Sequence, residues 1–408
     1  MMHARKYSAL LLCCLSVLGA EEADNPEGEG GEEVADASHV FFMSRAESLP
    51  DIKIEETTGH YLEGYIQALV DMHYYEHQVV VFVDDDVVYL ANLPNNALLS
   101  NSITSFVKDI PCVREVKVKC ELSEEESKER CGYVQQPCIS GIWFPQLTVL
   151  YQPMLADPRQ VMYSVAYRAG DRVIGRKVIT IAMGDNFPVY RWLNVFPWCG
   201  DLQIGIEAGI WAPFNFDDVS HDDGTYCELV NTDYLLGFPL DYAVDRWVFR
   251  LRLYHISSHL GDEFLVNRPF FLMERVNPSF EAIEFFTSYQ VTRNLRFYAG
   301  GGYMLHSDKS FPMDDFYVEY GGEVRWWTSR FCYQRLYGTF FFAVDVQNWQ
   351  VRDWDFDWTV KGGYEISKLQ GVGRKMRIFA AYHDGFSYEG QFFLLRTRYG
   401  ELGFSWGF

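Results

Sequence analysis

Beyond its first twenty residues the chain has no run of about 18 uninterrupted apolar residues, although 48% of its residues are hydrophobic. A membrane-spanning helix is therefore excluded, and a mature protein that enters a bilayer must do so as a closed barrel. Basic residues are also scarce: 35 Lys and Arg stand against 56 Asp and Glu, which gives a net charge of -21. Nucleic acid calls for a basic surface, so we expect no nucleic-acid partner.

Cysteine is sparse, and its spacing is not that of a metal site. The 9 cysteines include no CxxC pair and no Cys/His spacing of a zinc ligand set, so we expect no zinc. Four of them fall close together, at Cys112, Cys120, Cys131 and Cys138. In an oxidising compartment this cluster predicts one or two disulfides, whose connectivity the spacing leaves open, with at least one thiol left over.

The N-terminus predicts export. Residues 1–20 have a basic start, an apolar run from Ala9 to Leu18 and a small-residue exit at Ala20, which together are typical of a cleaved signal peptide. Residues 21–40 follow, and within them the stretch Glu21–Asp36 carries eight acids and no base. This composition predicts a disordered acidic tether.

The C-terminus predicts the compartment. From Leu402 to Phe408 large apolar residues alternate with Gly403, Ser405 and Gly407, and the chain stops on the phenylalanine. Such alternation would put one face of a strand in lipid and the other in a crowded lumen. The content of Tyr 26, Phe 31, Trp 11 and Gly 32 suits a barrel with aromatic girdles. A soluble β-sandwich that ends in an aromatic strand is the alternative.

From about Gly141 onward, stretches of roughly ten residues alternate apolar with polar side chains. Counting them predicts an all-β transmembrane antiparallel barrel of about twelve strands over residues 141–408, with ten or fourteen as rivals. Short joins at Ala243–Asp245 and Thr292–Arg293 alternate with long ones at Ser258–Ser279 and His306–Asp315. This is the pattern of an up-and-down barrel with its longer loops outside. The region Asp185–Asp201 has no place in the scheme.

Residues 41–140 predict a small α+β domain in the periplasm. Apolar spacing gives the order α-β-β-α-β for Gly59–Tyr75, Gln78–Val83, Val87–Leu93, Asn95–Ile110 and Arg114–Leu122. This order, with Val87-Val-Tyr-Leu90 and Pro111-Cys-Val113 at its turns, resembles the BON domain of periplasmic and outer-membrane proteins, although Asp86 and Cys112 replace its usual glycines. The resemblance implies binding to a lipid surface or a partner domain. A spacer without a ligand is the alternative.

The segment Arg246–Glu263 contains a strand that combines an apolar outer face with groups that could do chemistry. His255 and Ser257 have the parity of its leucines, so they would lie on the lipid-facing wall near the outer end of the strand. Their Cα atoms would be roughly 6–7 Å apart, within reach of a hydrogen bond that activates the serine. A third group must hold the imidazole. Asp262, Glu263 and Glu284 are the candidates, and we take Glu263 as the catalytic one.

A His-x-Ser pair on the outer face of a barrel resembles the active site of outer-membrane phospholipase A and of lipid A deacylases. The resemblance implies that Ser257 is the nucleophile and His255 its base, although Ser258 stands where those motifs usually have asparagine. The segment His255–Phe264, with the aromatic strands of Val161–Phe408, looks still more like an uncharacterised outer-membrane β-barrel family, a domain of unknown function in which the string HISSHLGDE recurs. That likeness implies a fold and a location and no activity.

Other interpretations of the same strand stay open. His255, Ser257 and His259 could be polar rim residues, or His259 and Asp262 could help to bind a divalent ion such as Ca²⁺. On the inner face, three arginines could form a salt-bridge lattice or an anion pore, and burial favours the lattice. These arginines are Arg246, Arg250 and Arg252, and the facing acids would be Glu207, Glu281, Glu319 and Glu323.

The sequence as a whole predicts a protein of the outer membrane of a Gram-negative bacterium. The favoured function is a structural or pore-forming barrel with a periplasmic domain. The alternative is a lipid-acyl serine hydrolase of the phospholipase A or lipid A deacylase type. The expected partners are outer-membrane lipids and, through Phe408, the barrel assembly machinery, and the oligomeric state stays open.

Overall fold

The computed structural model describes residues 59–84, 86–111, 113–119, 140–217, 227–267, 277–331 and 336–408. The predicted signal peptide, the acidic tether and the cysteine cluster lie outside these residues. The described residues belong to one unit, Thr57–Phe408. None of the helices in these ranges is both long and apolar enough to cross a membrane.

A small α/β region comes first in the chain. Its elements are α2 (Gly59–His73), β1 (Val80–Asp84), β2 (Val87–Ala91), α3 (Ala97–Lys108) and β3 (Glu115–Lys119). The β2 strand pairs antiparallel with β1 and parallel with β3. Asn96 begins α3 as its N-cap and accepts a hydrogen bond from the Leu99 amide at 3.2 Å. The apolar helix faces pack on the sheet around Ile66, Val88 and Ile103. This is the α-β-β-α-β order that the sequence predicts, and kinship with the BON domain stays a prediction.

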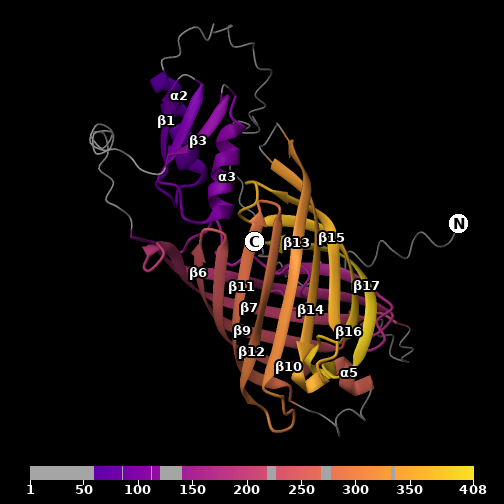
Figure 1. Ribbon diagram of the computed structural model, residues 1–408. Helices are drawn as coiled ribbons and strands as arrows, with labels where there is room; N and C mark the ends of the chain where they lie inside the picture. The colour runs from indigo at the N-terminus through magenta and orange to yellow at the C-terminus, as the bar shows by residue number, and fades with distance from the viewer. Residues whose placement is uncertain are drawn as a thin grey trace, which may run out of the picture. The chain divides into compact units, whose positions relative to one another are not determined.

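Twelve of the described strands close into an antiparallel barrel, which confirms the predicted fold class (Figure 1). Each strand pairs with its neighbours, and the last strand pairs back onto the first. The ring consists of β5 (Tyr163–Ala169), β6 (Lys177–Val195), β7 (Gly200–Asn215), β9 (Asn231–Val244), β10 (Trp247–Leu260), β11 (Ser279–Thr292), β12 (Leu295–Ser307), β13 (Phe316–Phe331), β14 (Leu336–Trp349), β15 (Asp357–Ser367), β16 (Lys375–Phe386) and β17 (Arg396–Gly407).

The strands bury one face and expose the other, as the alternation predicts. In β7 the side chains of Gln203 and Glu207 point into the barrel and are buried, whereas Ile204 and Ile206 lie on the outer face and are exposed. The same parity holds along most of the other strands, so aromatic and branched residues cover the outside, and charged residues together with some aromatic ones fill the inside.

The region Asp185–Asp201, which the sequence scheme could not place, belongs to the barrel wall. Residues 185–195 are the second half of β6, residues 196–199 are its join, and β7 begins at Gly200. The register of β6 against β7 shifts between Pro188 and Tyr190. A shift of this kind breaks the two-residue period, which is why the alternation could not be followed through this region.

The wall is interrupted beside β6. Both β4 (Gly141–Trp143) and β5 pair with the same strand, β4 at residues 190–192 and β5 at residues 177–182. Between β4 and β5 the chain turns into the barrel, and we call residues 146–160 the lumenal segment. Arg296 on β12 donates to the Gln152 carbonyl at 2.8 Å, and the Leu155 amide donates to Glu323 at 2.9 Å. The barrel interior therefore contains a length of main chain that the sequence did not predict.

Candidate functional site on the outer wall

The predicted His-x-Ser pair lies on the outer face of β10. Leu251 and Leu253 are exposed, and Arg250 and Tyr254, which flank them in the chain, are buried inside. His255 and Ser257 continue the outer row and are half-buried. Ser257 is three residues from the end of β10, on the side of the long join to β11.

The register of β10 against β11 sets Glu281 directly opposite His255. The His255 Nδ1–H donates to Glu281 Oε1 at 2.7 Å, and both side chains are about two-fifths exposed. A carboxylate that accepts from Nδ1–H fixes the tautomer in which Nε2 is an acceptor and can serve as a base.

This contact corrects two of the sequence-based expectations. Glu281 shares the parity of the exposed Phe285, so the prediction that it faces the lumenal arginines is wrong. Glu263, the predicted third catalytic member, lies exposed in the short helix α5 (Asp262–Asn267). The carboxylate beside His255 is instead Glu281.

A second histidine shares the same carboxylate. The register of β11 against β12 shifts between Glu281 and Ala282, so that His306 stands opposite Glu281. His306 Nδ1 lies 2.8 Å from Glu281 Oε2. A bulge re-aims a side chain, and here it turns a histidine outward next to an exposed leucine. We call His255, Glu281 and His306, together with Ser257 on the same row of β10, the outer-wall cluster. Among the described residues, Ser257 makes no hydrogen bond to His255.

The remaining predicted site residues do not join this cluster. His259 is exposed on β10, with its ring 5.9 Å from that of Tyr234, and Asp262 is exposed at the start of α5. Among the described residues, the one set of three His, Cys, Asp or Glu side chains spaced for a metal ion lies elsewhere. Glu284 faces inward, and Ser258 is buried and donates to Asn231 Oδ1 at 3.0 Å.

The lumenal arginines of β10 are ion-paired. Arg250 bonds both oxygens of Asp241, at 2.7 and 2.9 Å. Arg252 pairs with Glu207 at 2.6 Å and with Glu284 at 2.7 Å. Arg246 stands apart, because it is exposed at the start of the strand and donates to the Val291 carbonyl.

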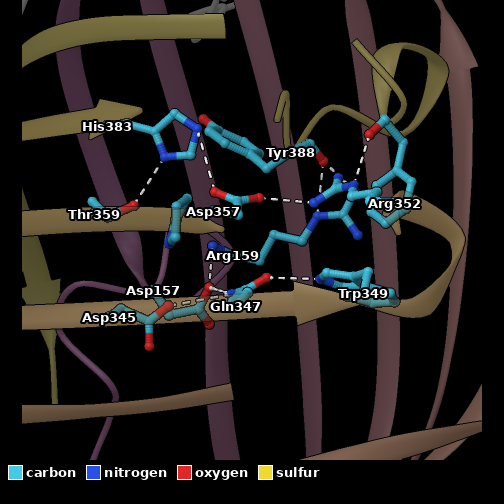
Figure 2. A pocket seen from close by; sticks show the side chains of 12 residues that line it. Asp157, Arg159, Asp345, Gln347, Trp349, Arg352, Asp357, Thr359, His383 and Tyr388 are labelled. Carbon is cyan, nitrogen blue, oxygen red and sulfur yellow. Dashed lines mark hydrogen bonds and ion pairs between the residues drawn. The ribbon is translucent and has the colours of Figure 1, made fainter. Parts of the chain in front are cut away.

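A small pocket inside the barrel is lined by the side chains drawn in Figure 2. His383 donates from Nε2 to the Phe386 carbonyl and accepts from the Thr359 hydroxyl, each at 2.9 Å. Arg352 pairs with Asp357 at 2.8 Å. These groups satisfy one another, so this histidine is held in place and is a poor candidate for a base.

A comparison with protein families shows which family this chain belongs to. The profile of a family described as "Protein of unknown function (DUF1207)" matches residues 73–408. The chain belongs to this family. Its membership agrees with the predicted domain of unknown function, whereas the HISSHLGDE string stays a sequence observation. A search of curated proteins finds no match.

Solved structures with a similar fold include outer-membrane phospholipases. The crystal structure of the Salmonella typhi outer membrane phospholipase dimer with bound calcium has 11% identity and a TM-score of 0.41, and the match covers 61% of this chain and 93% of that one. Outer membrane phospholipase A from Escherichia coli has 10% identity and a TM-score of 0.39 over the same shares. At this level of likeness we transfer neither residue roles nor an activity.

Glu281 and His306 are the members of the cluster that the sequence analysis missed. Strand parity could not have placed Glu281, because each face of β11 carries one glutamate and at least one phenylalanine. His306 leaves no signal either, since its direction depends on the bulge.

Proposed function

We propose that this protein is a lipid-acyl serine hydrolase that works from the outer wall of its barrel. Ser257 would be the nucleophile, His255 its general base, and Glu281 the group that orients the imidazole. The observation that carries this proposal is the 2.7 Å hydrogen bond from His255 to Glu281, on the same wall as Ser257.

The chemistry follows from the roles. His255 Nε2 would take the proton of the Ser257 hydroxyl while the serine oxygen attacks the carbonyl carbon of an acyl ester. The imidazolium would then protonate the leaving alcohol, and water would release the fatty acid from the acyl-serine. Glu281 would stabilise the imidazolium without itself taking the proton. Ser257 and His255 are two residues apart on one strand, so their Cα atoms are roughly 6–7 Å apart.

The position on the wall supports a lipid substrate. Polar groups on an apolar, lipid-facing surface are costly unless they meet head groups or do chemistry. The cluster lies near the end of β10 that leads into a long join, where a spanning strand would reach the head-group level. Ester bonds of membrane lipids lie at that level.

We do not propose a pore. The lumenal segment is buried against lumenal side chains, and Arg250 lies over the Tyr151 ring, 4.6 Å from its centroid. An interior with paired charges and a length of main chain across it favours a closed barrel. Such a barrel should give no steady ion conductance in planar bilayers.

The setting of the proposed enzyme is the outer membrane, with the α/β region on the periplasmic side. Short joins such as Asp245–Arg246 occur at one end of the strands and the long joins at the other, which favours this orientation. Phe408, whose carbonyl accepts from Arg377 at 2.7 Å, would be the feature that the assembly machinery recognises.

The test is fatty-acid release by the full-length protein in mixed micelles with diacyl phospholipid or with lipid A. Ser257→Ala should lower release at least about 10³-fold, because removal of the nucleophile leaves only residual catalysis. Ser279→Ala is the matched control, since Ser279 is the cross-strand neighbour of Ser257 on the same face. A fluorophosphonate probe should label the wild type and not Ser257→Ala. Equal release by both serine variants and wild type would refute the hydrolase.

A further inference from the structure

Three acidic side chains meet inside the barrel, away from the outer-wall cluster. Asp157 comes from the lumenal segment, Glu319 from β13 and Asp345 from β14. All three are buried, and one carboxylate oxygen from each lies within 4.8 Å of the other two. We call them the lumenal carboxylates.

The lumenal carboxylates differ from the other acids around them. Glu284 has Arg252 within 2.7 Å, and Glu323 has Arg296 within 2.8 Å. Within the described part of the chain, neither Asp157, Glu319 nor Asp345 has a lysine, arginine or histidine at ion-pair distance. Three like charges so close together and so deeply buried need a cation or protons to be tolerated.

Neutral donors satisfy only part of the set. Tyr298 donates to Asp345 at 2.7 Å, the Arg159 amide donates to Asp157 at 2.8 Å, and the Gln347 amide group reaches both carboxylates at 3.3 and 3.4 Å. Figure 2 shows Asp157 and Asp345 beside one another, next to Gln347. Oε1 of Glu319 is fully buried and, among the described residues, has no hydrogen-bond partner. An unsatisfied buried carboxylate oxygen beside two further carboxylates points to a missing ligand.

We propose that the lumenal carboxylates bind a hard divalent cation, with calcium as the best fit. Calcium takes oxygen ligands at 2.3–2.6 Å, so two oxygens on one ion can be at most about 5 Å apart. The 4.8 Å limit of this set meets that condition. Carboxylates without nitrogen or sulfur ligands select calcium or magnesium over the transition metals.

Such an ion would join three separate parts of the chain. Asp157 lies in the lumenal segment, whereas Glu319 and Asp345 belong to the wall. A bound cation would therefore fasten the segment inside the barrel. Asp157 and Asp345 also line the pocket of Figure 2. This site does not depend on the proposed hydrolase.

The test uses the full-length protein, folded in detergent and stripped with EDTA, and Tb³⁺ as the probe. The Trp349 indole donates to Gln347 at 3.1 Å and so lies close enough to sensitise Tb³⁺ emission. We expect saturable emission that Ca²⁺ reverses, and a melting temperature that Ca²⁺ raises. Glu319→Gln and Asp345→Asn should each weaken Tb³⁺ binding at least about tenfold and abolish the Ca²⁺ effect. Glu263→Gln, which removes an exposed acid, should change neither.

Two outcomes would overturn the proposal. One is Tb³⁺ emission and a Ca²⁺ response that are the same in wild type, Glu319→Gln and Asp345→Asn. The other is a wild type that does not respond to Ca²⁺ while Glu319→Gln melts at a higher temperature in EDTA. In that case shared protons, and not a cation, hold the lumenal carboxylates together. Neither readout involves lipid release, so the failure of this site and the failure of the hydrolase are distinguishable.

Discussion

The two faces of β10 use the same kinds of polar residue in opposite ways. On the inner face Arg250 is buried and Arg252 is mostly buried, and their acids neutralise them at 2.6–2.9 Å. On the outer face His255 contacts Glu281 while both stay about two-fifths exposed. The inner ion pairs are needed because a buried charge must be neutralised. On the outer wall, leucine in place of His255 and Glu281 would give a lower free energy against lipid. Polar groups that stability does not explain are the ones to test for activity.

The largest expected effect comes from breaking the inner face. Arg252→Met would leave Glu207 and Glu284 buried without their cation, which should lower the free energy of unfolding by about 3–5 kcal/mol. Urea unfolding of the barrel refolded into detergent or lipid would measure it. Arg246→Met removes an exposed arginine in the join just before the same strand and should change stability by less than about 0.5 kcal/mol. Equal losses in the two variants would contradict the contrast between buried and exposed charge.

The next effect separates the two faces within one strand. Glu281→Gln should lower fatty-acid release at least about 100-fold, because the imidazole loses the charge that orients and stabilises it. Its stability should change by less than about 1 kcal/mol, since the pair is exposed. Glu284→Gln, three residues on and facing inward, should retain release and lose stability instead. Similar behaviour of both variants in both assays would show that the distinction is false.

The smallest expected effect concerns a histidine that has no acidic partner among the described residues. His77, between α2 and β1, is buried, and burial together with Arg191 lowers its pKa to about 3. Below the unfolded value near 6.5, the unfolded chain takes up a proton that the native state refuses. Stability should therefore fall by up to about 1.4 kcal/mol per pH unit from pH 6.5 toward pH 3. His77→Gln should flatten this slope in urea unfolding followed at several pH values, and an unchanged slope would count against the assignment.

Much of the fold could be predicted because the signal is local. Strand parity in the stretch that became β7, and helical spacing in α2 and α3, depend on neighbouring residues alone. The faces of β11 were harder, since Glu281 and Glu284 lie on opposite faces and so do Phe285 and Phe286. The pattern of apolar and polar residues along β11 therefore does not show which of its faces points outward.

Two features could not be predicted: the strand register that brings His306 to Glu281, and the path of the lumenal segment through the barrel. His306 reaches Glu281 through a one-residue shift, and such a shift leaves no mark in composition. The lumenal segment contains Leu150, Tyr151 and Leu155, which look like any apolar stretch of wall. Only the arginines and acids around it reveal that it lies inside.

The interrupted strand also constrains how the molecule can be made. Tyr163 pairs with Trp406 across the seam where the first and last strands meet, and it follows within three residues of the lumenal segment. The strand β5 therefore follows the lumenal segment in the chain after a very short connection. If β5 and β17 paired before the lumenal segment had entered the barrel, the segment would remain outside the barrel. The pairing of β5 with β17 and the entry of the lumenal segment should therefore occur together at the end of biogenesis, after the other strands have paired.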